Sequence, residues 1–188
     1  MRVWILGALV LVRVLLPSPT WAQAVEDQIP GCLACHGEDG RPNAPEVPVI
    51  FGQQEGYLYF QLRDFKSGAR QSEAMNGIAA DLTKDTMKAL AAYFAAQTWP
   101  RLQQTATAEQ AAVTAKADTS GMCTSCHMEG YRGASTAPRL AGQQQAYLKR
   151  TLLQFKTKER ANNPAMSALV DTYPDADLEA IAHYLGSL

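Results

Sequence analysis

Two short stretches hold all four cysteines of the chain. The first is PGCLACHGEDG (30–40), and the second is GMCTSCHMEG (121–130). In each stretch, two cysteines stand on either side of a two-residue gap, and a histidine directly follows the second cysteine. Two of the chain's three histidines are used in this way. The pattern therefore indicates a chemistry that needs two thiols and an imidazole together.

Thiols at this spacing have several uses. C-x-x-C forms a disulfide in redox motifs, and paired C-x-x-C knuckles bind zinc, but neither use explains an adjacent histidine in both copies. C-x-x-C-H is the attachment site of c-type haem, in which the two thiols add to the porphyrin vinyl groups and the histidine binds the iron. We therefore predict two covalently bound haem c groups, with a zinc or disulfide scaffold as the alternative. The predicted attachment residues are Cys32, Cys35, Cys123 and Cys126, and the predicted histidine ligands are His36 and His127.

The two motifs belong to a longer internal repeat. PVIFGQQEGYLYFQLRDFKSGAR (48–70) aligns with PRLAGQQQAYLKRTLLQFKTKER (138–160) at an offset of 90 residues. AMNGIAADLTKDTMKALAAYF (74–94) aligns with AMSALVDTYPDADLEAIAHYL (165–185) at an offset of 91, as the cysteine motifs do. Repetition on this scale indicates a tandem duplication. Each half of the chain is therefore expected to be a haem domain of its own.

The repeat also predicts the sixth ligand of each iron. Met75 lies 39 residues after His36, and Met166 lies 39 residues after His127. We interpret both methionines as loop residues before the last helix of each half, where a thioether could reach the iron face opposite the histidine. The alternative is a methionine that fills a gap in the core. The shared register favours Met75 and Met166 as iron ligands.

A proline stands at the same place in both repeats. Pro48 and Pro138 each precede a glycine by four residues. One interpretation is a turn that leads into the next helix. The other is that the proline carbonyl accepts the Nδ1–H of the proximal histidine, which would fix the ring and strengthen it as a ligand. Both roles are compatible.

Helices are expected to position these residues around each haem. Apolar residues follow helical spacing, and no sustained alternation predicts a strand, so the fold class is all-α. Thr83 is expected to cap the last helix of the first half. A half of about 80 residues has a marginal core of its own, so the chain without haem is expected to be largely unfolded. The stripes of the terminal helices are Met87, Leu90, Ala91 and Phe94, then Leu178, Ile181, Ala182 and Leu185.

The N-terminus predicts export. Residues 1–24 have a positive start at Arg2, an apolar core at residues 3–16 and a small-x-small cleavage site at residues 22–24. Cleavage after Ala22 and an uncleaved N-terminal anchor are the alternatives. No later segment is long and apolar enough for a membrane span. The mature protein is therefore expected to be soluble in an oxidising compartment.

Together these motifs resemble the cytochrome c4 family of class I dihaem cytochromes c. The pieces that carry the resemblance are CLACHGEDG, PVIFGQQEGYLYFQLRDFKSG, EAMNGIAADL and LAAYFAAQ with their second-half partners. The resemblance implies two tandem small cytochrome c domains, at residues 25–100 and 101–188, each wrapped around one covalently bound His/Met-ligated haem and facing each other across a pseudo-twofold axis. It also implies electron transfer in the bacterial periplasm. The family usually has a helix before each haem motif. VEDQIPG (25–31) is too short for it, whereas TAEQAAVTAKADTSG (107–121) could form it.

Three functions fit this reading. The first is a diffusing electron carrier whose redox partners are a respiratory complex, a terminal oxidase or a dehydrogenase. The second is a haem subunit of a periplasmic dehydrogenase, such as a flavocytochrome sulfide dehydrogenase. The third, a dihaem peroxidase, needs an open iron position, which two methionine ligands would deny. Nothing suggests nucleic acid, and peripheral contact with a membrane is compatible with the sequence.

The charges of the two halves differ. Residues 25–100 carry six Lys/Arg and ten Asp/Glu, whereas residues 101–188 carry nine and eight. The basic cluster of the second half is either a solvated helix face or a docking patch for an acidic redox partner. It comprises Lys149, Arg150, Lys156, Lys158 and Arg160.

Overall fold

The structure is a computed structural model that describes residues 25–188, so the predicted signal segment lies outside the described residues. Within residues 25–188 the chain is helical, and its β structure is limited to an isolated bridge between Ala134 and Ala137. The all-α prediction is confirmed. No helix in this part of the chain has the length and apolar character to cross a membrane. The elements are α2 (Ile29–His36), α3 (Glu55–Ser67), α4 (Glu73–Ala80), α5 (Lys84–Ala95), α6 (Ala108–Gly121), α7 (Cys123–His127), the 3₁₀ helix η1 (Glu129–Tyr131), α8 (Gln145–Lys156), α9 (Pro164–Val170) and α10 (Asp175–Ser187).

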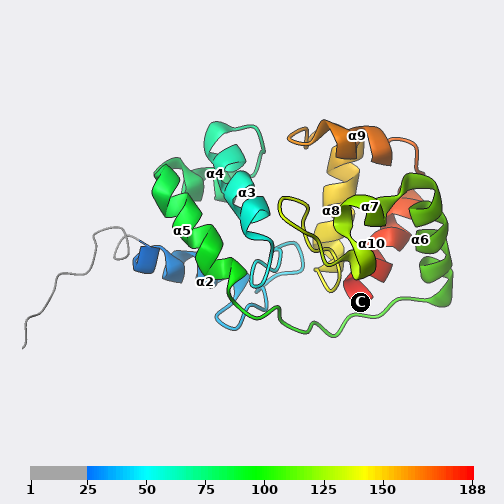
Figure 1. The fold of residues 1–188 in the computed structure, drawn as a ribbon, viewed down its shortest axis with the longest axis horizontal. Coiled ribbons are helices and arrows are strands. Elements are labelled where there is room, and N and C mark those ends of the chain that lie inside the picture. Colours follow the sequence, from blue (N-terminus) through cyan, green and yellow to red (C-terminus); the bar gives the residue numbers. More distant parts are fainter. Residues whose placement is uncertain (1–24) are drawn as a thin grey trace, which may run out of the picture.

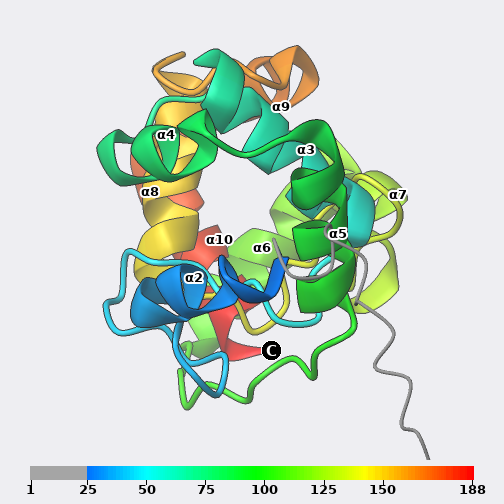
Figure 2. The same ribbon diagram turned by 90° about the vertical axis from the view of Figure 1, so that its left-hand side faces the viewer.

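The helices divide into two halves that follow the sequence repeat. The first half, residues 25–100, holds α2 to α5, and the second half, residues 101–188, holds α6 to α10 (Figure 1). An extended segment joins the halves and runs along one edge of the molecule. Seen from the end in Figure 2, the first half stands in front of the second. In the first half α3 packs on α4 and α5, and in the second half α8 packs on α9 and α10.

Each half has its own apolar core. The predicted stripe of α5 is buried, and so is the predicted stripe of α10. In the first core the α5 stripe packs with Phe51, Leu58 and Phe65. In the second core the α10 stripe packs with Leu148 and Phe155. The helical spacing read from the sequence therefore identified the buried faces.

Side-chain caps determine where several helices begin. The Thr83 hydroxyl accepts a hydrogen bond from the backbone N–H of Thr86, as predicted. Thr107 and Gln110 form a capping box at the start of α6, since each side chain satisfies a backbone N–H of the other residue. Helix α6 is thus the helix expected before the second haem motif, and it packs against α10.

The predicted loop position of the two methionines is wrong. Met75 lies in the first turn of α4 and Met166 in the first turn of α9. The reason is capping: the Ser72 side chain accepts from the Met75 N–H at 3.4 Å, and the Asn163 side chain accepts from the Met166 N–H at 3.2 Å. A serine or asparagine that precedes the methionine by three residues stabilises a helix start there.

Candidate cofactor site

One cavity brings the predicted site residues of both halves together. Its volume is about 1330 Å³, which exceeds the roughly 300–1,000 Å³ of an ordinary ligand pocket. The space suits ligands larger than a single small molecule. All eight predicted residues line it: Cys32, Cys35, His36, Met75, Cys123, Cys126, His127 and Met166.

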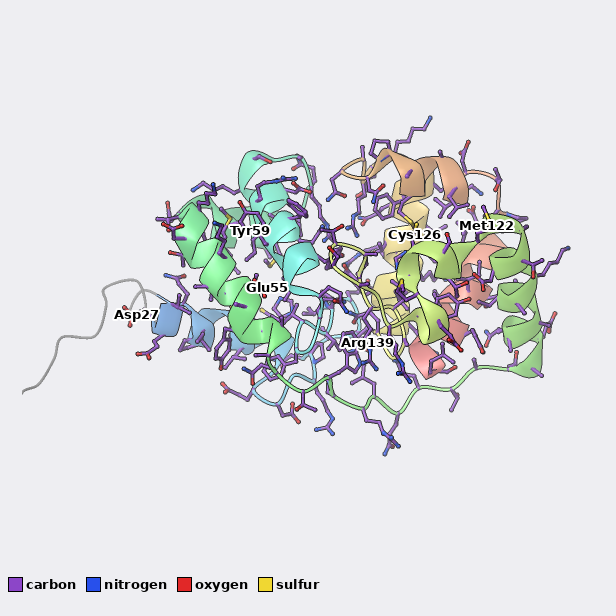
Figure 3. The ribbon with its side chains drawn as sticks, viewed as in Figure 1. Asp27, Glu55, Tyr59, Met122, Cys126 and Arg139 are labelled. Carbon is purple, nitrogen blue, oxygen red and sulfur yellow. The ribbon has the colours of Figure 1, made fainter. Side chains whose placement is uncertain are left out.

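The four cysteines are available for covalent attachment. All four are free thiols; Cys32 and Cys123 are half-buried, whereas Cys35 and Cys126 are exposed. Figure 3 shows Cys126 on α7, on the side that faces the first half. Within residues 25–188, no group of three or more Cys, His, Asp or Glu side chains is placed to hold a metal ion. The geometry therefore does not favour the zinc alternative.

Both predicted histidine ligands are held in the same way. The Nδ1–H of His36 donates to the Pro48 carbonyl at 2.8 Å, and the Nδ1–H of His127 donates to the Pro138 carbonyl at 2.9 Å. This confirms the carbonyl role expected of the two prolines. Burial lowers the pKa of both imidazoles, and the bond to the carbonyl opposes that shift only in part. Each ring is therefore kept neutral, with Nε2 left as the lone-pair donor that an iron ligand requires.

The methionines complete the two sets. Met75 packs against the first core and Met166 against the second, and both are only partly buried. Each lines the same cavity as the histidine of its own half. Every residue that the sequence assigned to the iron therefore lines this one cavity.

A polar network that the sequence analysis did not predict joins the two halves. Arg70 donates to the Tyr147 hydroxyl at 3.1 Å and to Gln61 at 2.8 Å. Arg160, at the position that the repeat aligns with Arg70, donates to Gln61 at 3.0 Å and to the Tyr57 hydroxyl at 3.4 Å. Tyr57 and Tyr147 therefore each hydrogen-bond an arginine of the opposite half. The signal in the sequence was their recurrence at the 90-residue offset.

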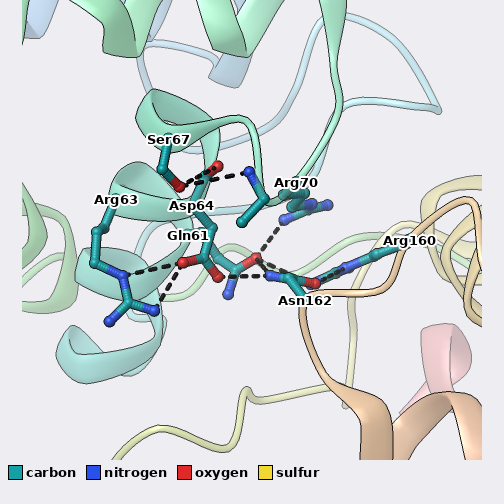
Figure 4. A network of polar contacts seen from close by, with 8 residues as sticks. Gln61, Arg63, Asp64, Ser67, Arg70, Arg160 and Asn162 are labelled. Atoms are coloured by element: carbon teal, nitrogen blue, oxygen red, sulfur yellow. Dashed lines mark hydrogen bonds and ion pairs between the residues drawn. The ribbon is translucent and has the colours of Figure 1, made fainter.

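The network continues through Asn162 and Asp64. Asn162 accepts from Arg160 at 3.0 Å, and its amide donates to Asp64 at 2.8 Å and to Gln61 at 3.3 Å. Figure 4 shows these side chains converging from both halves, with Arg63 bonded to the other oxygen of Asp64. Gln61 therefore accepts from both halves at once.

Arg70 and Arg160 bring positive charge to the network, whereas its carboxylate, Asp64, pairs with Arg63. Arg70 and Arg160 are buried and line the cavity. Within residues 25–188 neither guanidinium forms an ion pair. Burial raises the pKa of the Tyr147 phenol, but the charges of Arg70 and Arg160 outweigh that effect and lower it to about 7. A buried charge needs a counter-charge, so this part of the cavity suits the carboxylates of a ligand.

An unpartnered hydroxyl also faces this cavity. Thr151 lines the cavity, and its buried Oγ1 has no hydrogen-bond partner within residues 25–188.

Haem carries the chemical groups that the residues of this cavity need as partners. It has two vinyl groups for the thiols, an iron for the imidazole and thioether, and two propionate carboxylates for the arginines. The residues present therefore fit haem.

The basic cluster of the second half is largely neutralised, so the docking-patch interpretation is not supported. Lys149 pairs with Glu179 at 2.6 Å, Arg150 with Glu46 at 3.0 Å and Lys156 with Asp175 at 2.6 Å. Arg160 is buried in the network. Only the pattern along the helix was visible in the sequence, whereas the compensating carboxylates come from other elements.

Comparison with known proteins agrees with this site. A family model described as cytochrome C oxidase, cbb3-type, subunit III matches residues 106–185. Cytochrome c4 of Pseudomonas aeruginosa is 34% identical to the chain over 170 residues, which cover 84% of this chain and 83% of that protein. The chain belongs to the cytochrome c4 family. It is thus a dihaem cytochrome c that carries electrons and is not itself an enzyme, and its cofactors are two covalently bound haem c groups.

The solved structures agree with the family assignment. The cytochrome c4 of Acidithiobacillus ferrooxidans superposes with a TM-score of 0.75 at 30% identity, covering 84% of this chain and 98% of that one. A relative named thiosulfate dehydrogenase electron acceptor, from Thiomonas intermedia, is 32% identical and covers 89% of this chain and 82% of its own length. Cytochrome c4 proteins and an electron acceptor of a dehydrogenase are therefore both similar to this chain, which has redox proteins as partners.

Proposed function

We propose that the protein is a periplasmic electron carrier with one haem domain at residues 25–100 and another at residues 101–188. His36 and Met75 are the axial ligands of the first iron, and His127 and Met166 are those of the second. Residues 1–24 are the export signal. The observation that carries the proposal is the single cavity lined by both complete sets of Cys, Cys, His and Met.

The roles of the chain's own residues follow from their contacts. Haem, when bound, supplies a one-electron iron couple. Pro48 and Pro138 hold the ring proton of each histidine at Nδ1, which orients the ring and makes it a better donor. Arg70 and Arg160 supply positive charge for the propionates, and the apolar cores exclude water from the site.

A dehydrogenase as electron donor is the second candidate for the partner. The Thiomonas intermedia relative is named for accepting electrons from thiosulfate dehydrogenase, and it matches most of this chain. The same fold could serve as a free carrier or as the haem subunit of such an enzyme. A respiratory complex or a terminal oxidase would then be the acceptor.

Redox titration of the purified protein, combined with isolation from its host, tests this function. The expected result is two low-spin haems that accept one electron each and do not react with peroxide. A haem that is high-spin or turns over peroxide would favour the peroxidase instead. Recovery of the protein in a stable complex with a dehydrogenase would favour the subunit role. Recovery of the protein without a bound partner would favour the free carrier.

A further inference from the structure

Two buried glutamines each form hydrogen bonds to the backbone of the opposite half. The Gln143 side chain accepts from the Val49 N–H at 2.7 Å and donates to the Val49 carbonyl at 2.9 Å. The Gln53 side chain accepts from the Arg139 N–H at 2.7 Å and donates to the Arg139 carbonyl at 3.0 Å. Each glutamine therefore holds a backbone unit of the opposite half at two points, as a neighbouring strand would.

The amides are fixed before they reach across. The Gln143 oxygen also accepts from the N–H of Gln144, and the Gln53 oxygen accepts from the N–H of Gln54, both at 2.9 Å. Gln53 and Gln143 are 3% and 2% exposed. Because the partner residue offers one N–H and one C=O, only one orientation of each amide satisfies both bonds. Loss of either side chain would leave buried backbone groups unpaired.

The residues held in this way adjoin the prolines that orient the histidines. Val49 follows Pro48, whose carbonyl accepts from His36, and Arg139 follows Pro138, whose carbonyl accepts from His127. Arg139 lies where the two halves meet (Figure 3), and its guanidinium stacks over the Trp99 ring at 4.5 Å. A short chain of contacts therefore runs from each glutamine to the histidine of the opposite half.

We propose that Gln53 and Gln143 are positioning residues that act across this boundary. Gln143 holds the Pro48 carbonyl in place for His36, and Gln53 holds the Pro138 carbonyl in place for His127. Each half thereby sets the donor strength of the other half's histidine, so the two reduction potentials depend on the halves being docked. The proposal rests on the proposed function, because it takes His36 and His127 as iron ligands.

Replacing one glutamine should produce a crossed effect. In the haem-loaded Gln143→Leu variant the bond from His36 to Pro48 should weaken, so that the histidine donates less and the potential of the first haem rises. The second haem should shift far less. Gln53→Leu should do the reverse. Spectroelectrochemistry gives both potentials, and the Nδ1–H proton NMR signals of His36 and His127, followed through the redox titration, assign each potential to its half.

Two further variants separate positioning from stability. Gln143→Asn keeps a neutral amide but is one carbon shorter, so it cannot reach both Val49 groups and should give the same crossed shift at smaller size even if Gln143→Leu does not fold. Gln54 donates to the Arg132 carbonyl at 3.1 Å, which also crosses the boundary but does not adjoin a proline. Gln54→Leu should therefore leave both potentials unchanged.

The outcomes are distinct. Crossed shifts, together with unchanged potentials in Gln54→Leu, support the proposal. Shifts confined to the variant's own half, equal shifts of both haems or no shift would overturn it. If the wild-type protein itself lacked two histidine-ligated low-spin haems, the ligand assignment would fail, and with it the proposed function.

Discussion

Arg70 in the first half donates a hydrogen bond of 3.1 Å to the hydroxyl of Tyr147 in the second half. The repeat-related pair, Arg160 and Tyr57, makes the same bond in the opposite direction, at 3.4 Å. The arginines also stack on aromatic rings of their own halves, Arg70 over Phe65 at 4.6 Å and Arg160 over Phe155 at 4.4 Å. The boundary between the halves is therefore built twice from one sequence pattern.

The two tyrosines should not contribute equally to stability. Tyr147→Phe leaves an N–H of the buried Arg70 without its partner, which is expected to cost about 1–3 kcal/mol of the free energy of unfolding. Tyr57→Phe removes a longer bond and is expected to cost less. Urea unfolding of the two haem-loaded variants measures the difference. A loss for Tyr57→Phe that equals or exceeds the loss for Tyr147→Phe would contradict the geometry.

Replacing either methionine should change one haem only. Met75→His and Met166→His each exchange a thioether for a stronger donor, so one potential should fall while the other stays nearly unchanged. The weak near-infrared absorption from sulfur bound to iron should fall by about half in each variant, because one of two such bonds is lost. If Met75→His left this absorption and both potentials untouched, Met75 would not be a ligand.

Without haem the chain should not hold this fold. The cavity of about 1330 Å³ lies between small cores, and a half of about 80 residues is marginal without added stabilisation. Protein made in cells that cannot attach haem should show little helical circular dichroism. The double variant Cys123→Ser with Cys126→Ser should keep a folded first half. A haem-free chain that unfolds cooperatively from full helix content would refute this expectation.

Charge reversal in the basic cluster should have little effect on partner binding. Lys156 is paired with Asp175, so the cluster projects less field than its sequence indicates. Reversing Lys156 and Lys158 to Glu should change the association rate with an acidic partner by much less than the roughly 10–10³-fold that steering supplies. Reversing the exposed Lys84 and Lys88 of the first half alters the net charge equally. A far larger slowing for the Lys156 and Lys158 variant than for this control would restore the docking patch.

The repeat made much of the site readable from the sequence. Met75 and Met166 were predicted as ligands because both stand at one distance from a histidine, and both line the cavity. The role of the proline carbonyls was anticipated because Pro48 and Pro138 share one register. Helical spacing identified the buried stripes. The residues that each half contributes to its own haem lie close together in the sequence. Because the same pattern recurs in the second half, these residues could be recognised from the sequence.

The contacts between the halves could not be read in the same way. Gln53 and Gln143 recur in the repeat, but nothing along the chain says that each binds the opposite half. Arg160 appeared to be part of a basic helix face, whereas the fold buries it against residues about a hundred positions earlier. The loop expected at Met75 is a helix because Ser72 caps it, which is a local signal that the sequence analysis overlooked.

The mass of the purified mature protein after acid–acetone extraction tests the central claim most directly. Extraction removes haem that is not covalently bound, whereas thioether bonds from the cysteines retain it. The account predicts a polypeptide that still carries two haem groups, one for each C-x-x-C-H motif. A haem-free polypeptide, or one that retains a single haem, would contradict it.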